Sequence, residues 1–434
     1  MYPNIYFLVK EWFGVELDFL RMFNTFGLLV ACGFLAGGWV LTKELKRLQS
    51  KQYLKPVYKK ITVGNGAETS TIISNAFFGF ILGFKIIGIF VVENALKNPQ
   101  DFLLSKQGSW LAGILLAALA GGYTWYTGNK NKLSKPETRE IRFWPHDRVG
   151  DIIMLAAIFG FAGAKIFHNL ENFDTFIKDP IGSLTSFDGL TFYGGLICAG
   201  AAILIYAKKN SINRWHLVDT FGPALMIAYA VGRLGCQISG DGDWGITNSA
   251  YISTPEGKVV PATFSEYEQT VQNNLSYYKQ SLHGVTEVND VKDVWHKTVK
   301  APSWLPTGFV AYNYTNNVIN EGVPIANCEG DWCRQLPVPV FPTPFYEAIM
   351  GLILFVILWK IRLKIDAPGV LFGIYLIFNG MERFLIEKIR VNTTSNFLGM
   401  HLSQAEIISF FLILAGIAII ILRKNKKPEI IAIK

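Results

Sequence analysis

The sequence is poor in charged residues. Aspartate, glutamate, lysine and arginine make up 17% of its 434 residues, whereas apolar residues make up 50%. A soluble domain carries roughly 25% charged residues, and here the deficit is concentrated in uncharged runs such as 26–41 and 407–422. Because a membrane-spanning helix needs about 20 mostly apolar residues, this composition excludes an ordinary soluble protein and predicts an all-α polytopic membrane protein.

Histidine is scarce as well. The six histidines show no spacing typical of metal ligands, so we expect neither a metal nor another cofactor. The net charge of +8 does not indicate a nucleic-acid partner. The basic residues form short clusters between apolar segments, which is where membrane-topology signals lie.

Nine apolar segments are predicted to be membrane-spanning helices. They are residues 17–41, 72–93, 108–126, 149–168, 190–207, 216–235, 344–361, 369–388 and 402–422. Every odd-numbered segment is followed by a basic cluster, whereas the alternate loops are acidic or mixed. Since basic loops stay in the cytoplasm, the sequence predicts nine crossings, with the N-terminus outside and the C-terminus in the cytoplasm.

This topology divides the chain into three parts. Residues 1–245 carry helices one to six, 246–340 form an extracytoplasmic loop domain, and 341–434 carry helices seven to nine and a basic cytoplasmic tail. The loop is too long for a plain connector. Cys328 and Cys333 lie close together in it, facing an oxidising compartment, so we expect a disulfide, with two free thiols as the alternative.

The chain also contains a weak internal repeat. A shift of 80 residues aligns 71–86 with 151–166 and matches Gly83 with Gly163. The two segments within 72–126 are then an inserted helix pair related to segments four and five, although apolar helices also resemble one another by chance. Repeats are common in transporters, which keeps a transporter as an alternative function.

Six polar or charged residues are predicted at the outer ends of the helices: Tyr193, Arg233, Glu347, Arg383, Glu387 and Arg390. Outer arginines run against the positive-inside bias. Arg383, Glu387 and Arg390 are spaced i, i+4 and i+7 and share a helix face. We expect the carboxylate to hold both guanidinium groups in an orientation that suits a phosphate. The alternative is that the arginines are snorkelling anchors at the head-group level.

Two glycine-rich stretches flank these residues. Tyr193 directly precedes a Gly-Gly pair, and Arg233 begins a stretch rich in glycine and aspartate. Glycine lets the backbone approach a ligand closely, although in membrane helices it more often serves helix packing. The residues expected to bind substrate are Arg233, Gly194, Gly195, Asp241, Gly245, Glu347, Glu387 and Arg390.

Taken in order, these stretches resemble the prolipoprotein diacylglyceryl transferases. The matching stretches are FNTFGLLVACGFLAG, DGLTFYGG, GRLGCQISGDGDWG, FPTPFYEA, FGIYLIFNGMERFLIEKIR and SQAEIIS. The most specific is Gly-Arg-x-Gly at Gly232, Arg233 and Gly235, and the Arg-Phe-x-x-Glu-x-x-Arg pattern is the second. The resemblance covers 17–41, 149–245 and 340–422. It implies a seven-helix core, which is what remains when the inserted pair is removed from nine.

The resemblance also implies a reaction and its place. An enzyme of this family, in the bacterial inner membrane with its active site on the periplasmic side, moves the diacylglyceryl group of phosphatidylglycerol to the lipobox cysteine thiol of a prolipoprotein signal peptide. Glycerol-1-phosphate leaves, and this is the first step of lipoprotein maturation. The implied partners are phosphatidylglycerol, prolipoprotein signal peptides and membrane lipid.

Chemical roles follow from the demands of this reaction. Arg233 and Arg383 are expected to stabilise the charge that grows on the leaving phosphate. The thiol must lose its proton to react, and Tyr193 is expected to accept or relay it, with Glu347 or Asp241 as alternatives. Tyr193 stands where the family commonly has histidine, so a mechanism with a histidine base does not carry over.

Two functions from other classes stay open on the sequence. A transporter predicts charged residues distributed through the membrane depth, whereas those found here are predicted at one side. A non-catalytic assembly or receptor protein explains the outer domain but not arginines beside glycine-rich stretches.

Overall fold

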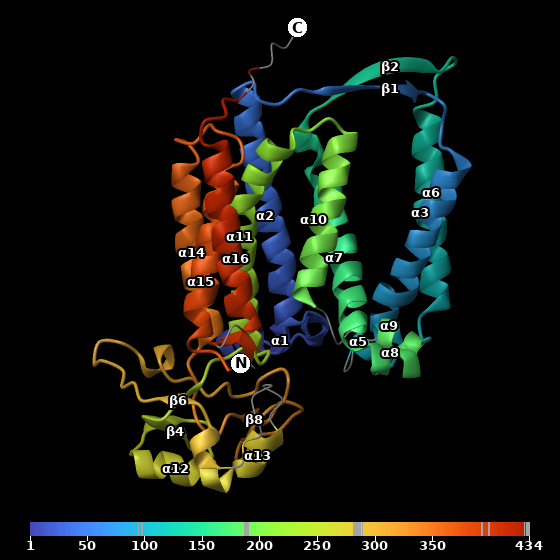
Figure 1. The fold of residues 1–434 in the computed structure, drawn as a ribbon. Helices are drawn as coiled ribbons and strands as arrows, with labels where there is room; N and C mark the ends of the chain where they lie inside the picture. Colours follow the sequence, from blue (N-terminus) through green and yellow to red (C-terminus); the bar gives the residue numbers. More distant parts are fainter. Residues whose placement is uncertain are drawn as a thin grey trace.

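A long helix lies in each of the nine predicted apolar segments, within the part of the chain that the structure describes (Figure 1). This computed structural model describes residues 1–430 except 94, 97–98, 186–190, 281–287, 289, 392–393, 398–399 and 429. The first residue of segment 190–207, and 188–190 of the DGLTFYGG stretch, lie outside the described residues. The long helices are α2 (Thr25–Ser50), α3 (Thr69–Ile81, continued by the π-helical η2, Leu82–Ile87, and α4, Gly88–Val91), α6 (Trp110–Lys130), α7 (Val149–Glu171), α10 (Phe192–Lys209), α11 (Arg214–Ser239), α14 (Thr343–Ile361), α15 (Val370–Glu387) and α16 (Gln404–Arg423).

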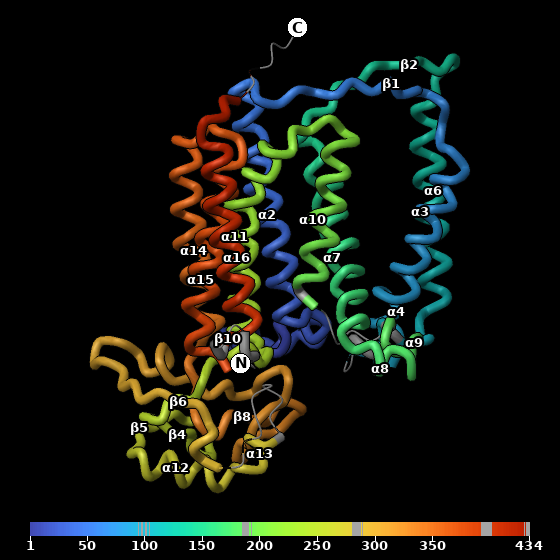
Figure 2. The backbone as a smooth tube through the Cα atoms, viewed as in Figure 1, coloured from blue at the N-terminus to red at the C-terminus, as the bar shows by residue number. Residues whose placement is uncertain are grey.

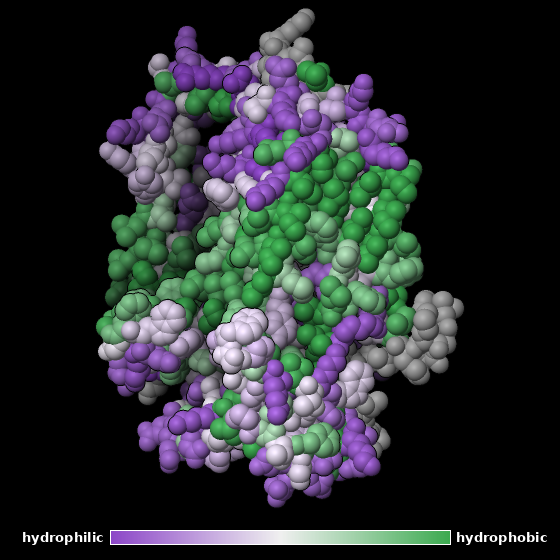
Figure 3. Space-filling model, turned by 90° about the vertical axis from the view of Figure 1, so that its left-hand side faces the viewer, coloured by the Kyte–Doolittle hydropathy of each residue, from purple (hydrophilic) through white to green (hydrophobic). Residues whose placement is uncertain are grey.

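Among the described helices, six stretches are long and apolar enough to cross a membrane. They are Thr25–Ser50, Thr69–Val91, Pro145–Glu171, Arg214–Ser239, Thr343–Ile361 and Gln404–Arg423. Figure 3 shows apolar side chains over the middle of the visible face and hydrophilic ones at both ends. The chain is therefore a polytopic membrane protein.

The first helix begins later than predicted. Residue 17 was expected to open it, but α2 starts at Thr25, and Asp18–Met22 form the separate 3-10 helix η1. The side chain of Asn24 accepts the backbone N–H of Gly27 at 3.2 Å, which is the cap that starts the helix. The same helix continues past residue 41 to Ser50, because Leu45 and Leu48 are buried on its far turns.

Five helices, α2, α11, α14, α15 and α16, form the main bundle (Figure 1). α2 lies directly on α11, where a Cβ at Gly33 would stand 3.0 Å from the carbonyl oxygen of Ala228 and one at Gly37 would stand 3.1 Å from that of Ala224. Such small residues allow helix backbones to approach closely. The bundle thereby brings the C-terminal ends of α11 and α15 and the N-terminal end of α14 together at one end.

The other four long helices form two antiparallel hairpins, α7 with α10 and α3 with α6, and the second lies outermost in Figure 1. A ribbon of β1 (Val57–Val63) and β2 (Glu137–Phe143), paired from Val57↔Phe143 to Val63↔Glu137, carries the chain to and from the outer hairpin. Gly83 and Gly163, which the internal repeat aligns, both lie where two helix backbones come close together. A Cβ at Gly83 would clash with the carbonyl of Ala112, and one at Gly163 with that of Gly194. Each glycine lets the two helices of its hairpin pack closely. The internal repeat itself stays a prediction.

Residues that follow α11 build a small folded region beneath the bundle, drawn in yellow and orange in Figures 1 and 2. It has its own core, in which Tyr267, Val271 and Val338 are fully buried. Its elements are β3 (Thr247–Asn248), β4 (Tyr251–Ser253), β5 (Val259–Pro261), α12 (Phe264–Asn273), α13 (Leu275–Gln280), η4 (Val291–Asp293), β6 (His296–Lys297), η5 (Thr307–Phe309), β7 (Val323–Pro324) and β8 (Arg334–Gln335).

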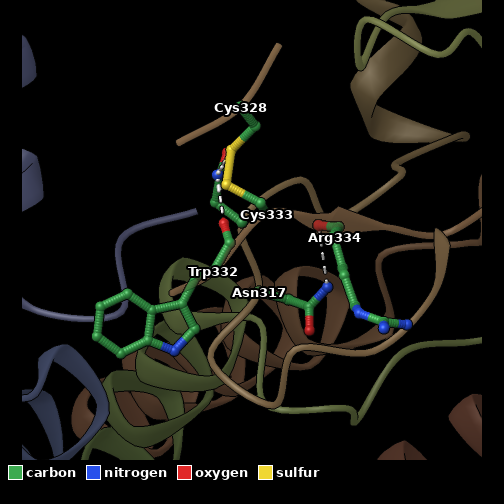
Figure 4. The surroundings of a disulfide bond; sticks show 6 residues. Asn317, Cys328, Trp332, Cys333 and Arg334 are labelled. Carbon is green, nitrogen blue, oxygen red and sulfur yellow. Dashed lines mark hydrogen bonds between the residues drawn. A yellow bond between two sulfur atoms is a disulfide. The ribbon is translucent and has the colours of Figure 1, made fainter. Parts of the chain in front are cut away.

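The predicted disulfide is confirmed in this region. Cys328 and Cys333 are bonded, with their Cα atoms 5.6 Å apart (Figure 4). Asn316 donates a hydrogen bond to the backbone oxygen of Trp332 inside the closed loop at 2.6 Å. The remaining short elements are α1 (Ile5–Phe13), α5 (Pro99–Leu104), η3 (Pro145–Arg148), α8 (Phe173–Lys178), α9 (Pro180–Thr185), β9 (Thr394–Phe397) and β10 (Met400–Ser403).

Candidate active site

A buried carboxylate organises the end of the bundle that faces the small folded region. Glu347, in the first turns of α14, has no exposed surface. Its carboxylate lies 3.2 Å from Nε of Arg233, 3.4 Å from Nη1 of Arg383 and 3.6 Å from Nη1 of Arg390. An uncompensated charge is very costly to bury. Three arginines from two helices and a loop therefore converge on one carboxylate.

A second carboxylate, Asp243, joins two of these arginines and was not among the predicted site residues. It pairs with Nη1 of Arg233 and, at 2.7 Å, with Nη2 of Arg390. Burial alone would raise the pKa of Asp243, but Arg390 and Arg233 outweigh it and lower that pKa to about 2. The same contact reverses the effect of burial on Arg390, whose pKa is raised. Asp243 is thus ionised in the folded protein.

Arg383 is held less tightly than its neighbours. Its two ion pairs, with Glu347 and with Glu387 one turn on, both measure 3.4 Å, and its side chain is 24% exposed. Arg233 is 18% exposed and Arg390 is 12% exposed. At 3.4 Å a charge-assisted hydrogen bond is longer than its usual range of about 2.7–2.9 Å. Arg383 is therefore the guanidinium best able to turn towards a ligand.

The predicted arrangement of Arg383, Glu387 and Arg390 on one helix face is correct only in part. Glu387 pairs with Arg383 as the i, i+4 spacing predicts. α15 ends at Glu387, however, so helical spacing no longer governs Arg390. The ion pairs of Arg390 are instead with Asp243 and Glu347, which belong to other elements.

Tyr193 lies in the first turn of α10, near the arginine cluster. Its side chain is partly buried, and Arg383 and Glu387 are the charged groups that act on its phenol. The hairpin of α7 and α10 therefore brings Tyr193 to the same end of the molecule as the arginines. A further tyrosine that the sequence did not single out, Tyr229, stacks under Arg233 at 5.4 Å and donates to Glu382 at 3.0 Å.

The predicted glycines have structural contacts that account for their small size. Gly194 and Gly195 are buried against α7, with Gly195 facing the carbonyl of Gly160. Gly245 lies in a bridge to Arg390, where a Cβ would stand 2.6 Å from the carbonyl oxygen of Ile389. These glycines fix the approach of the backbones that carry Tyr193 and Arg390. Contact of the three with substrate stays a prediction.

Asp241 forms no ion pair with the three arginines among the described contacts. Its carboxylate interacts with the thiol of Cys236 and accepts the backbone N–H of Asp243 at 3.4 Å. Burial raises the pKa of Asp241. Ligand atoms of Cys236, Asp241 and Asp243 lie within 4.8 Å of one another, which is a spacing that could hold a metal ion. Both oxygens of Asp243 are already paired with arginines, so the charge around this group favours an anion over a cation.

Comparison with known proteins supplies the context for this geometry. A family model described as prolipoprotein diacylglyceryl transferase matches residues 109–422, a range that includes α6 but begins after α2 and α3. A phosphatidylglycerol–prolipoprotein diacylglyceryl transferase of Chlorobaculum tepidum is 26% identical over 344 residues, which are 76% of this chain and 91% of the relative. The protein of the same name from Streptococcus pyogenes serotype M5 is 26% identical over 285 residues, 65% of this chain and 81% of the relative.

Proposed function

The chain belongs to the prolipoprotein diacylglyceryl transferase family, and on that premise we propose that it transfers the diacylglyceryl group of phosphatidylglycerol to the lipobox cysteine of a prolipoprotein. The cysteine sulfur forms a bond to the glyceryl carbon while the bond from that carbon to the phosphate oxygen breaks. Glycerol-1-phosphate leaves with the electron pair. The observation that carries this proposal is the cluster of three arginines around Glu347.

The arginines can stabilise the negative charge that develops on the leaving group in this step. The leaving phosphodiester becomes a phosphomonoester, and preorganised cationic donors stabilise the charge that develops. Arg383 is the proposed principal donor, because its contacts to Glu347 and Glu387 are long. Arg233, held by Glu347 and Asp243, supplies the second donor from α11.

Glu347 and Asp243 are proposed as positioning residues. Each bridges more than one guanidinium group, and a planar guanidinium recognises phosphate well only when its donors are correctly aimed. Their negative charge also balances much of the cluster when no lipid is bound. Arg390 links the two carboxylates and so ties the end of α15 to the loop after α11.

The proton of the thiol requires an acceptor or relay, and Tyr193 is our proposal because Arg383 is among the charged groups that act on its phenol. Asp241 is the runner-up, since burial raises the pKa of its carboxyl and thereby makes it a stronger base. Glu347 is less suited to this role. Its carboxylate is fully buried, and its oxygens are already engaged by three arginines.

We further propose nine crossings of a bacterial inner membrane, with the N-terminus and residues 246–340 on the periplasmic side. The proposal is supported by the arginine cluster and the small folded region lying at one end of the bundle, and the C-terminal end of α16 at the other (Figure 1). It is also supported by the α-amino group of Met1, which donates to the carbonyl oxygen of Thr315 in that region at 2.8 Å. In this scheme α3 and α6 are an inserted pair.

The purified chain, phosphatidylglycerol and a lipobox peptide provide the test. We expect the peptide to gain the mass of a diacylglyceryl group and glycerol phosphate to appear in equal amount. A peptide with serine in place of the cysteine is the control, because its hydroxyl is a far weaker nucleophile than a thiolate. Glycerol phosphate release without a change in peptide mass would contradict the transfer reaction.

A further inference from the structure

A polar pocket opens at the opposite end of the bundle from the arginine cluster, where α2 ends and α11 begins. It is lined by side chains that can donate hydrogen bonds, and none of its lining residues is acidic. The donors are Tyr53, Lys55, Ser211, Asn213 and His216. No residue of the proposed transfer site belongs to it.

His216 is the most informative member of the pocket. Only 2% of it is exposed, and its ring stacks on Tyr53 at 5.4 Å. Apart from the backbone bonds within α11, its only hydrogen bond among the described residues is made by its backbone N–H, which donates to the side chain of Asn213. The ring nitrogens are therefore available to a partner in the pocket. The ring borders the pocket, so a ligand in the pocket can reach it.

The charges around the pocket favour an anion. Arg47 and Arg423 are the charged residues that act on His216, and Lys55 lies at the rim. Nη1 of Arg47 is buried and has no hydrogen-bond partner in the described structure. Two buried carboxylates of the helices at this end have partners of their own. Glu44 pairs with Arg47 and Arg362, whereas Asp219 accepts two backbone N–H groups at the start of α15.

We infer that this pocket binds a phosphate group, supplied by the head group of an anionic phospholipid. Basic pockets between membrane helices are suited to such head groups. The pocket joins the loop after α2, the start of η3 and the start of α11, since Leu54, Pro145 and Ile212 complete its lining. A bound head group would therefore hold the hairpin of α7 and α10 to the main bundle at this end. The inference does not depend on the transfer reaction.

Two probes, dioctanoyl phosphatidic acid and inorganic phosphate, distinguish a lipid from a free anion. Binding to the full chain in neutral detergent is measured by native mass spectrometry and by the shift in melting temperature. Lys55 is exposed, so Lys55→Ala is expected to fold normally. Lipid affinity should fall about fivefold in Lys55→Ala and recover in Lys55→Arg, which corresponds to one cationic contact.

Lys59→Ala is the matched control, because Lys59 is an exposed lysine of β1 outside the pocket. None of these substitutions alters the arginine cluster, so lipid binding there should be equal in all the variants. A difference in total lipid affinity between them therefore reports on the pocket. A Lys55-dependent response to inorganic phosphate alone would identify a free phosphate as the source. Equal binding of both probes by the native chain, Lys55→Ala and Lys55→Ala with His216→Gln would overturn the inference.

Discussion

The carboxylate of Glu347 lies 3.2 Å from Nε of Arg233, although the two residues come from helices separated by the whole small folded region. Their contact joins the start of α14 to the end of α11. Arg383 and Arg390 reach the same carboxylate from α15 and the residues after it. Glu347 is thus the point at which three segments of the candidate site meet.

Loss of Glu347 should destabilise the protein more than loss of any surface acid. Glu347→Ala leaves three arginines facing one another without their shared partner, and breaking a buried ion pair costs about 3–5 kcal/mol. Glu347→Gln should be milder, because its amide oxygen still accepts hydrogen bonds. Thermal unfolding in detergent measures both. Glu16→Ala, which removes an exposed ion pair with Lys10, is the control and should leave the melting temperature essentially unchanged.

Removal of either principal arginine should strongly reduce turnover without unfolding the protein. Arg383→Ala and Arg233→Ala are each expected to lower turnover by about 10²–10³-fold, the usual loss for one donor to a developing anion. Arg383→Lys should recover only part, because an ammonium group is a point charge without a planar pair of donors. Peptide transfer rates give the measurement, and Arg139→Ala on the exposed ribbon is the control. Normal turnover in Arg233→Ala would exclude the proposed site.

The periodic part of the site was predictable from sequence, whereas the contacts between segments were not. Helical spacing is enough to pair Arg383 with Glu387. The choice of Asp243 over Asp241 depends instead on the turn after α11. Gly240 and Gly242 have φ angles of +68° and +97°, which redirect the chain so that only the later aspartate meets the arginines. No pattern in a single sequence specifies that turn.

The helices themselves were predictable because apolar runs identify them whatever they pack against. Their ends were less so. Residue 17 was expected to open the first helix, but the cap at Asn24 starts it later. The pairing of Glu347 with Arg233 depends on how α14 packs on α11, and a single sequence holds no record of that packing. Distant partners such as these become visible only in three dimensions.

Ionisation of Asp243 should make the stability of the protein depend on pH in the acidic range. Its pKa is lowered to about 2 in the folded state, below the ordinary value of 3.8. Its contribution is therefore complete above about pH 4 and is lost as the pH falls towards 2. Asp243→Asn should lower stability by about 1 kcal/mol at neutral pH, a value reduced for screening because a third of the side chain is exposed. Melting temperatures of the native and variant chains should converge as the pH falls from 4 to 2.5. A constant difference over that range would contradict this assignment.

The bond between Cys328 and Cys333 should stabilise the small folded region locally. On the chain-entropy model, closing so short a loop raises the free energy of the unfolded chain by about 2 kcal/mol. Replacing both cysteines with serine should expose the loop to proteases while leaving the helices intact. Limited proteolysis followed by mass analysis measures this. Cys32→Ser, which removes a thiol outside the region, is the control. Unreduced protein that is alkylated at both Cys328 and Cys333 would show that the bond is absent.

Tyr193 offers the sharpest test of the proposed chemistry. If its phenol accepts the thiol proton, Tyr193→Phe should lower turnover by roughly 10²–10⁴-fold with little change in substrate affinity. If the phenol only positions lipid beside Arg383, the loss should be smaller and shared with affinity. An interfacial aromatic anchor would tolerate phenylalanine almost fully.

Tyr193→His separates these outcomes further, because imidazole titrates near pH 6.5. A base at this position predicts retained activity with a pH optimum shifted downward, whereas a positioning role predicts an unshifted profile. The measurement is the pH dependence of turnover for the native chain and both variants, with Tyr58→Phe on the exposed ribbon as a tyrosine control. Full activity of Tyr193→Phe at every pH would remove Tyr193 from the mechanism and leave Asp241, whose pKa burial raises, as the proton acceptor to test next.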